Sequence, residues 1–150
     1  MADWAFEVRA TSKAPVEAVW PLISEAARWK EWSFLTHSGL EREGEPAPDG
    51  VGAIRRFTAL GVGSREEVVA WEPPRHLGYV ILSGFPVRNY RGDVVLTAEG
   101  DRTMLTWASS FDTKIPGTGP LMHEVLYLII SRFAAGVVRA ADAGLEVLTG

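Results

Sequence analysis

Residues 121–133 read LMHEVLYLIISRF and begin an apolar segment that contains no proline up to its end at Leu148. Its apolar residues recur at alternating spacings of three and four, which is the period of one face of an α-helix. They are Met122, Val125, Leu126, Ile129, Phe133, Val137, Ala140, Ala141, Gly144 and Leu148. We predict one helix over residues 118–147, opened by Pro116 and about 45 Å long at 1.5 Å per residue. One face of such a helix must pack on a broad apolar surface.

Six segments before this helix are typical of β-strands. They are residues 4–11, 53–59, 64–71, 76–83, 90–98 and 103–111. The connections at residues 61–63, 73–75 and 99–101 are too short to contain a crossover helix, so we expect an antiparallel sheet. Six strands at about 4.8 Å spacing span roughly 24 to 29 Å, which the long helix would cross completely. Where a twisted sheet curves away from the helix, we expect a cavity.

Two short helices and one loop complete the prediction. Pro15 suits the first turn of a helix that carries Val16, Val19, Trp20 and Ile23 at helical spacing, and residues 28–32 continue as a second short helix. Residues 39–52 hold several prolines and glycines and are predicted to be a loop.

Length and composition favour a single domain over residues 1–150, because 150 residues with 47% hydrophobic content suffice for one core. The net charge is −4 and the basic residues are scattered, which argues against a nucleic-acid partner. The chain has no cysteine, so disulfides and thiolate chemistry are excluded. The amino terminus lacks the pattern of a signal peptide, and Glu124, Arg132 and Arg139 interrupt the apolar helix. We expect a cytoplasmic protein without stable membrane insertion, either a monomer or a homodimer.

Local motifs support a family resemblance over nearly the whole chain. They are residues 14–20 (APVEAVW), 29–32 (WKEW), 50–52 (GVG) with Arg55 and Phe57, 72–77 (EPPRHL) with Tyr79, and 103–107 (TMLTW). Their order resembles the START and SRPBCC superfamily, in particular its polyketide cyclase/dehydrase branch. The resemblance implies an α+β helix-grip fold, in which a curved antiparallel sheet wraps around a long C-terminal helix, with two short helices after the first strand. It also implies an internal pocket for a small hydrophobic or amphipathic molecule, such as a lipid, a polyketide-like compound or an aromatic compound.

The alternation of side chains along each strand predicts which residues line that pocket. On the strand at residues 64–71, Trp71 facing inward would bring Val69 and Glu67 inward with it. The full set of expected ligand-binding residues is Arg55, Phe57, Glu67, Val69, Tyr79, Ile81, Tyr90, Val94, Trp107, Met122, His123, Leu126, Ile129 and Phe133. Arg55 and Glu67 either orient a polar group of the ligand or form a salt bridge at the sheet edge, and a register error of one residue would turn both to solvent. Tyr79 and Tyr90 either donate hydrogen bonds into the pocket or only pack.

No catalytic residue is evident. The serines lack a nucleophile elbow, and no two histidines have metal-ligand spacing, so neither a metal nor a cofactor is expected. His123, near the start of the long helix, is the best candidate for a general base, against a merely surface or helix-start role. Trp20 is expected in the core, whereas Trp29 and Trp32 either pack or stack on a flat ligand. Residues 84–89 form an apolar connection that could gate the pocket.

Three functions remain open at this point. The first is a binding or carrier protein for a small hydrophobic molecule. The second is an enzyme similar to aromatic polyketide cyclases, in which the pocket folds a reactive chain and one acid or base moves a proton. The third is a non-catalytic module that binds a partner through its surface because its groove is collapsed.

Overall fold

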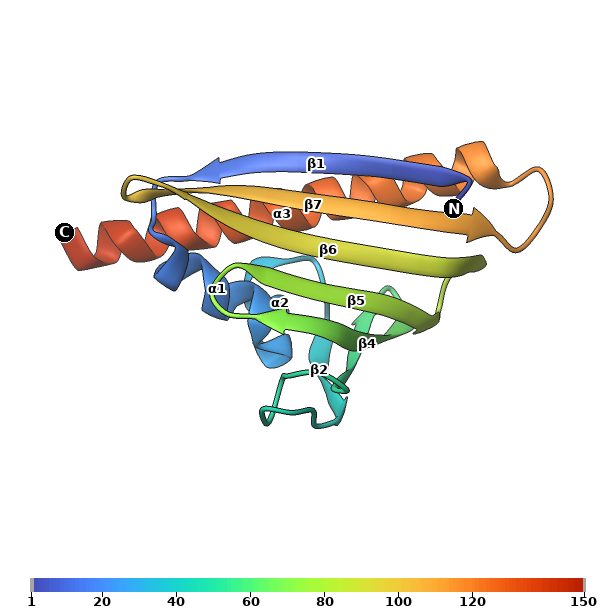
Figure 1. Ribbon diagram of the computed structural model, residues 1–150, viewed down its shortest axis with the longest axis horizontal. Helices are drawn as coiled ribbons and strands as arrows, with labels where there is room; N and C mark the ends of the chain where they lie inside the picture. The colour runs from blue at the N-terminus through green and yellow to red at the C-terminus, as the bar shows by residue number, and fades with distance from the viewer. Residues whose placement is uncertain (1, 150) are drawn as a thin grey trace.

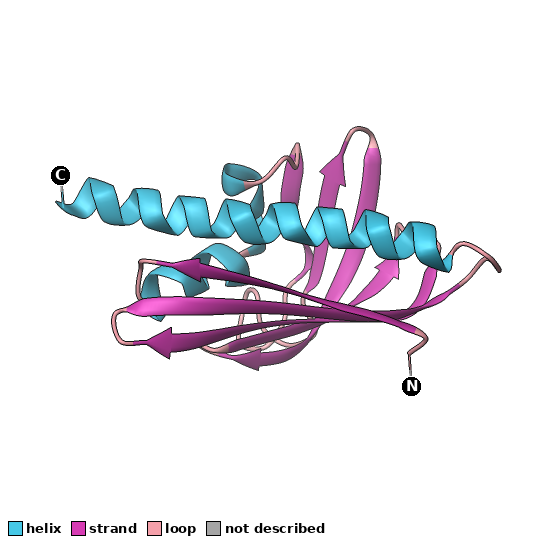
Figure 2. Ribbon diagram, turned by 90° about the horizontal axis from the view of Figure 1, so that it is seen from above, coloured by secondary structure: helices cyan, strands magenta, loops and turns pink. Residues whose placement is uncertain are grey.

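The computed structural model describes residues 2–149, with side chains through Gly144. The sheet has seven antiparallel strands in the order β1-β7-β6-β5-β4-β3-β2, and helix α3 (Gly119–Thr149) lies across one face of it (Figures 1 and 2). The strands are β1 (Trp4–Ser12), β2 (His37–Arg42), β3 (Ile54–Ala59), β4 (Val62–Glu72), β5 (His76–Ser83), β6 (Val87–Glu99) and β7 (Arg102–Thr113). Helix α1 (Val16–Ser24), a 3₁₀ turn (Ala26–Arg28) and helix α2 (Trp29–Trp32) follow β1. The helix-grip fold expected from the sequence is confirmed.

The long helix packs on β1 and β7, and one side of the sheet rises beside it (Figure 2). Met122, Leu126, Phe133, Val137 and Ala141 are buried, as the helical period predicts. The buried face also includes Ile130 and Ala134, whereas Val125 and Gly144 are exposed and the side chain of Leu148 lies outside the described residues. The apolar stripe is therefore rotated slightly from the predicted one.

Helix α3 begins at Gly119, three residues after Pro116. The hydroxyl of Thr118 donates to the Ile115 carbonyl at 2.6 Å, and Gly117 has a φ of +83°, so a turn precedes the helix. By length and composition, the segment Gly119–Gly144 could cross a membrane, with a mean hydropathy of 1.5. In this fold, 39% of its apolar window is buried inside the protein.

The seventh strand, β2, was not expected: it begins after the predicted short helix at residues 28–32 and runs into the predicted loop at residues 39–52. Its sequence, HSGLER, has little of the apolar alternation that marks a strand. Ser38 explains its position, because the buried hydroxyl of this residue accepts a hydrogen bond from the Lys30 amide at 3.0 Å and donates to the Ala27 carbonyl at 3.2 Å. The strand is thus held to the short helices by polar contacts, which a hydrophobic pattern does not show.

Strand β4 contains a β-bulge, which changes which of its side chains face the inside of the fold. Val68 lies opposite Tyr79, but Ala70 lies opposite the next residue of β5, Gly78, so Val69 is an extra residue in β4. Trp71 faces inward and packs on Trp20 at 5.3 Å between ring centroids, as expected. The prediction assigned every second residue before Trp71 to the inner face of the sheet. Because the bulge at Val69 adds one residue, this assignment fails for residues before it. The predicted inward facing of Glu67 is therefore wrong, and Val69 is the unpaired residue of the bulge.

The short helices are fixed to the sheet by tryptophan side chains. Trp29 stacks on Phe57 with ring centroids 4.5 Å apart and donates its indole N–H to the Ile23 carbonyl at 3.1 Å. Trp32 donates to the Leu22 carbonyl at 2.9 Å. Both indoles are buried and neither lines the pocket described below. Of the two alternatives for these residues, the structure shows packing.

Candidate ligand pocket beside helix α3

A pocket of about 320 Å³ lies between strands β3–β6 and the first half of α3. Most of its wall is apolar, and its polar side chains are Ser64, Glu66, Tyr79 and Tyr90. The complete lining is Phe34, Leu35, Phe57, Ala59, Leu60, Val62, Gly63, Ser64, Glu66, Tyr79, Ile81, Phe85, Tyr90, Leu126, Ile129, Ile130 and Phe133. An apolar wall with a few polar groups is the usual composition of a small-molecule site.

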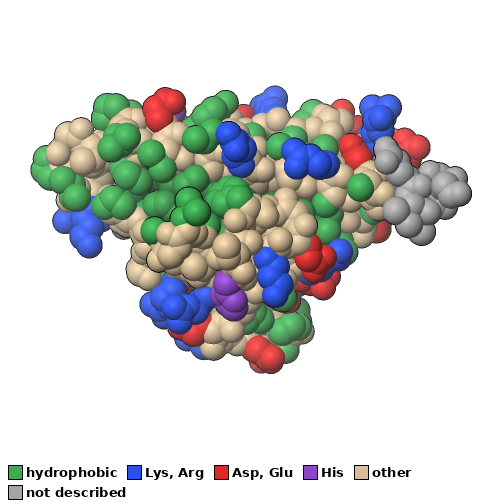
Figure 3. Space-filling model, turned by 180° about the vertical axis from the view of Figure 1, so that it is seen from behind, with side chains coloured by type: hydrophobic (Ala, Val, Ile, Leu, Met, Phe, Trp, Pro, Cys, Tyr) green, Lys and Arg blue, Asp and Glu red, His purple; other side chains and the backbone are tan. Residues whose placement is uncertain are grey.

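The rim of this pocket is apolar and open to solvent. Phe34, Leu60 and Val62 line the pocket and are also exposed, by 50%, 96% and 62% of their surfaces. Leu121 and Leu128 on α3 are exposed as well. Figure 3 shows hydrophobic side chains gathered over the half of the molecule away from the C-terminal end of α3. An apolar molecule could therefore approach the pocket along an apolar surface.

A buried ion pair lies behind the pocket wall. Arg55 on β3 and Glu66 on β4 are directly opposite each other, and Nη2 of Arg55 donates to Oε1 of Glu66 at 2.5 Å. The side chain of Arg55 is fully buried, and its guanidinium carbon lies 4.7, 5.1 and 5.2 Å from the ring centroids of Trp29, Phe57 and Tyr79. Arg55 does not line the pocket, whereas Glu66 does.

Burial and a single cationic partner, Arg55, have opposite effects on the pKa of the Glu66 carboxylate. Burial raises its pKa, and the charge and hydrogen bond of Arg55 lower it in part, so that the net pKa lies above the ordinary value. Among the described residues, no donor reaches its second oxygen, Oε2. Arg55 in turn has a buried Nε without a hydrogen-bond partner. The pair is thus incompletely satisfied on the protein side.

A chain of hydrogen bonds joins the two tyrosines of the pocket to residues behind them. The Trp107 indole donates to the Tyr79 hydroxyl at 3.0 Å, Tyr79 and Tyr90 hydroxyls are 3.3 Å apart, and Tyr90 and Ser109 hydroxyls are 2.8 Å apart. Burial raises the pKa of Tyr79 well above its ordinary value and that of Tyr90 to about 12. Both phenols are therefore protonated at neutral pH and can donate.

The structure brings half of the predicted ligand-binding residues to this pocket. These are Phe57, Tyr79, Ile81, Tyr90, Leu126, Ile129 and Phe133. Arg55, Val94, Trp107 and Met122 are buried in the core without lining the pocket. Glu67 is on the other face of β4, 3.8 Å from Arg42, and Val69 does not line the pocket. His123 packs against β1 instead, with its ring centroid 5.5 Å from that of Phe6.

Several lining residues were not predicted from the sequence. They are Phe34, Leu35, Ala59, Leu60, Val62, Gly63, Ser64, Glu66, Phe85 and Ile130. Ile130 follows Leu126 by four residues, so the helical period could have indicated it. Phe85 belongs to the segment proposed as a gate, and that proposal stays a prediction. Glu66 had no such signal, because its facing depends on the bulge at Val69.

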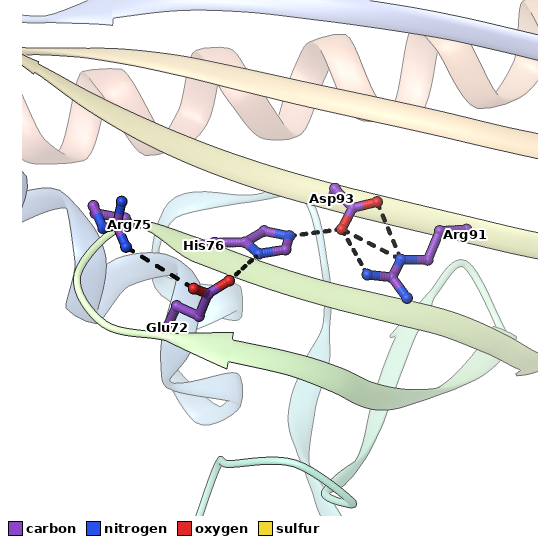
Figure 4. A network of polar contacts seen from close by, with 5 residues as sticks. All are labelled: Glu72, Arg75, His76, Arg91 and Asp93. Carbon is purple, nitrogen blue, oxygen red and sulfur yellow. Dashed lines mark hydrogen bonds and ion pairs between the residues drawn. The ribbon is translucent and has the colours of Figure 1, made fainter.

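A second polar cluster occupies the opposite face of the sheet (Figure 4). Nδ1 of His76 lies 2.9 Å from Glu72 and Nε2 lies 2.7 Å from Asp93, which Arg91 also contacts at 2.9 Å. Burial lowers the pKa of His76, but the hydrogen bonds of both carboxylates outweigh it and raise the pKa overall. With a carboxylate at each ring nitrogen, the imidazole is suited to hold both protons. Within residues 2–149, no set of three or more acidic, histidine or cysteine residues is arranged to hold a metal ion.

Comparisons with known proteins identify the family of the chain and agree with its fold. The family model described as polyketide cyclase/dehydrase and lipid transport matches residues 3–147. No curated protein matches the chain. Among solved structures, a START superfamily protein from Mycobacterium smegmatis superposes with a TM-score of 0.78 at 12% identity, covering 96% of this chain and 98% of that one. The protein XoxI from Bacillus cereus gives 0.75 at 19% identity, with 93% and 95% covered. An uncharacterized protein from Bacillus thuringiensis gives 0.75 at 19% identity, with 92% and 98% covered. At these identities the likeness shows a shared fold.

Proposed function

The chain belongs to the polyketide cyclase/dehydrase and lipid transport family, and we propose that it binds a small, mostly apolar molecule in the pocket beside α3. The observation that carries this proposal is the pocket itself, an open apolar hollow that contains one buried carboxylate, Glu66. A folded protein gains stability by filling apolar space with its own side chains, so an unfilled apolar pocket with a polar group inside suits a ligand. The open pocket argues against a module with a collapsed groove.

The volume limits the size of the ligand. One water takes about 30 Å³ of liquid, so 320 Å³ corresponds to the space of about ten waters. Ligand pockets in proteins range from roughly 300 to 1,000 Å³, which places this one at the small end. A molecule of one or two rings, or a short chain, fits inside. A lipid with two long chains would leave most of its length outside the rim.

The proposal is tested by blocking the pocket without disturbing the fold. Ile129 lines the pocket and is half-buried, whereas Leu128, one residue earlier on α3, is 54% exposed and does not line it. We expect Ile129→Trp to abolish uptake of a neutral apolar probe, 2-methoxynaphthalene, in calorimetric titrations. Leu128→Trp serves as the matched control and should bind like the unaltered protein. Equal binding by both variants would refute the proposal.

A second candidate function is an enzyme that moves a proton on a polyketide-like substrate. One observation favours it: Glu66 is a carboxylate inside an apolar pocket with a raised pKa, which is a property of general acids and bases. His123 is outside the pocket, and the two phenols are too weakly acidic for this role. The test is deuterium exchange at the central carbon of a 1,3-diketone followed by NMR. Acceleration that disappears in Glu66→Gln but not in Glu67→Gln would support an enzyme, and no acceleration would exclude this chemistry.

A further inference from the structure

The arrangement of charges behind the pocket wall limits the polar group that a ligand can carry, an inference that rests on the proposed function. Arg55 is the only cation in contact with Glu66 among the described residues, and it lies behind the carboxylate as seen from the pocket. Three aromatic rings surround its guanidinium, and the side chain has no exposed surface. A ligand in the pocket therefore meets the negative member of the pair.

The free oxygen of Glu66 needs a donor. Oε1 accepts from Arg55, no described residue donates to Oε2, and the residue lines the pocket. Since Oε2 is absent from the buried atoms without a partner, it keeps some accessible surface, and a ligand in the pocket that supplies an O–H or N–H can hydrogen-bond to it. A ligand carboxylate would instead place a second negative charge against the first, and none of the residues found to line the pocket is a Lys, Arg or His.

The tyrosines of the pocket can supply a hydrogen-bond donor to the ligand. Three hydroxyls, those of Tyr79, Tyr90 and Ser109, share two contacts with one another, and Tyr79 also accepts the Trp107 N–H. Because each hydroxyl has one proton, two contacts use two protons and leave one free, and the direction of the two hydrogen bonds decides which hydroxyl keeps it. When Ser109 donates to Tyr90 and Tyr90 donates to Tyr79, the free proton is that of the Tyr79 hydroxyl.

Glu66 and Tyr79 lie on neighbouring strands and both line the pocket. Tyr79 pairs with Val68 in the sheet, and Glu66 is two residues from Val68 on the same face of β4. Such diagonal neighbours on adjacent strands are about 7–8 Å apart, within reach of long and aromatic side chains. A ligand bound against this wall therefore meets an acceptor, Glu66, and a donor, Tyr79.

We propose that the ligand carries a neutral hydroxyl, phenolic or alcoholic, whose proton is donated to Glu66 and whose oxygen accepts from Tyr79, and that the pocket rejects carboxylates. A hydroxyl on the ligand can both donate to the carboxylate and accept from the phenol, so it matches these two side chains best. The aromatic lining, with Phe34 stacked on Phe133 at 5.1 Å, suits a flat ring beside it. The ligand class is thus a hydroxylated aromatic or polyketide-like compound, and fatty acids are excluded.

Three probes of equal ring size test this on the unaltered protein. They are 2-naphthol, which donates, 2-methoxynaphthalene, which only accepts, and 2-naphthoate, which is anionic. In calorimetric titrations at pH 7, we expect 2-naphthol to bind at least tenfold more tightly than either of the others, since a hydrogen bond to a charged group contributes about 1.5–3 kcal/mol. Equal affinities for naphthol and methoxynaphthalene would overturn the inference and leave the proposed function standing. Naphthoate binding as tightly as naphthol would also overturn it, and binding of none of the three would overturn both.

A variant pair adds an independent test. In Glu66→Gln, Arg55 loses its anionic partner, so an anionic ligand now supplies the missing charge. We expect naphthoate to bind this variant at least tenfold more tightly than the unaltered protein and to raise its melting temperature. Glu67→Gln, on the other face of β4, is the matched control and should keep the original preference for naphthol. Unchanged selectivity in folded Glu66→Gln would contradict the proposal, and if that variant does not fold, the three-probe series decides alone.

Discussion

Separate and combined removal of Arg55 and Glu66 should have unequal effects on stability. In Glu66→Leu, the fully buried guanidinium remains without its partner and cannot lose its proton. Breaking a buried pair in this way costs about 3–5 kcal/mol. For a chain of this length, each kcal/mol corresponds to roughly 2–4 °C, so the melting temperature should fall by about 6–20 °C. Because a guanidinium stays charged, Arg55 should give the Glu66→Leu variant itself no pH-dependent change in stability between pH 5 and 8.

The converse variant, Arg55→Met, leaves a carboxylate that can become neutral. Protonation costs about 1.36 kcal/mol for each pH unit above the ordinary pKa. The ordinary pKa of a glutamate is 4.5. Because Glu66 can take up a proton instead of remaining charged, the loss of unfolding free energy from its unpaired charge is at most about 3.4 kcal/mol at pH 7 and about 0.7 kcal/mol at pH 5. A buried glutamate with a raised pKa loses stability as pH rises, so this variant should become more stable as the pH falls. The double variant should be close to the unaltered protein, because two apolar side chains of similar size replace the pair.

The assay is urea unfolding, followed by tryptophan fluorescence, from pH 5 to pH 8. A matched cycle on Arg42 and Glu67, which are 3.8 Å apart on the other face and partly exposed, should show a coupling below about 1 kcal/mol. The reasoning is wrong if Arg55→Met costs the same at pH 5 and pH 8, or if the double variant loses the sum of the two single losses.

Three further predictions concern other parts of the fold. In Gly92→Ala, the new Cβ would overlap the ring of Tyr79, so we expect a loss of about 1–3 kcal/mol in urea unfolding and weaker naphthol binding; unchanged binding would contradict the placement of that ring. Leu126→Ala should cost about 2–5 kcal/mol because Leu126 is only 2% exposed, whereas Leu128→Ala, on the exposed face, should change the unfolding free energy little. His76→Gln should lose stability mainly near pH 6 and less as the pH rises. The two carboxylate neighbours raise the pKa of His76, so the stabilisation by its charged ring disappears once that ring loses a proton in the folded protein. A difference in unfolding free energy between the two proteins that grows with pH would refute this.

The architecture was predictable because its main signals are local and repeated. The helical period over residues 118–147 fixed α3 to within a few residues, and short connections such as residues 73–75 required antiparallel neighbours. Strand β2 was missed because its buried residue is Ser38, held by its hydroxyl, and Leu40 packs only partly against the core. Polar attachment of a short edge strand leaves no apolar alternation in the sequence.

The pocket was predictable only in part, for a different reason. Inward-facing residues of regular strands, such as Phe57, Tyr79 and Tyr90, follow from alternation, and they line the pocket. Residues of its rim come from turns and loops, where no period applies; Phe34 and Leu60 are examples. Side chains that face inward can also be covered by others, as Trp107 is, so that facing alone does not identify a lining residue.

The bulge at Val69 links the core to the chemistry of the pocket. Without an extra residue, Trp71 and Glu66, five positions apart, would point to opposite faces of β4. With it, Trp71 packs on Trp20 in helix α1 while Glu66 faces the pocket and pairs with Arg55. A regular strand that kept Trp71 in the core would turn Glu66 to solvent and leave Arg55 buried without a partner. One inserted residue therefore lets the same strand anchor the short helices and place a carboxylate in an apolar pocket.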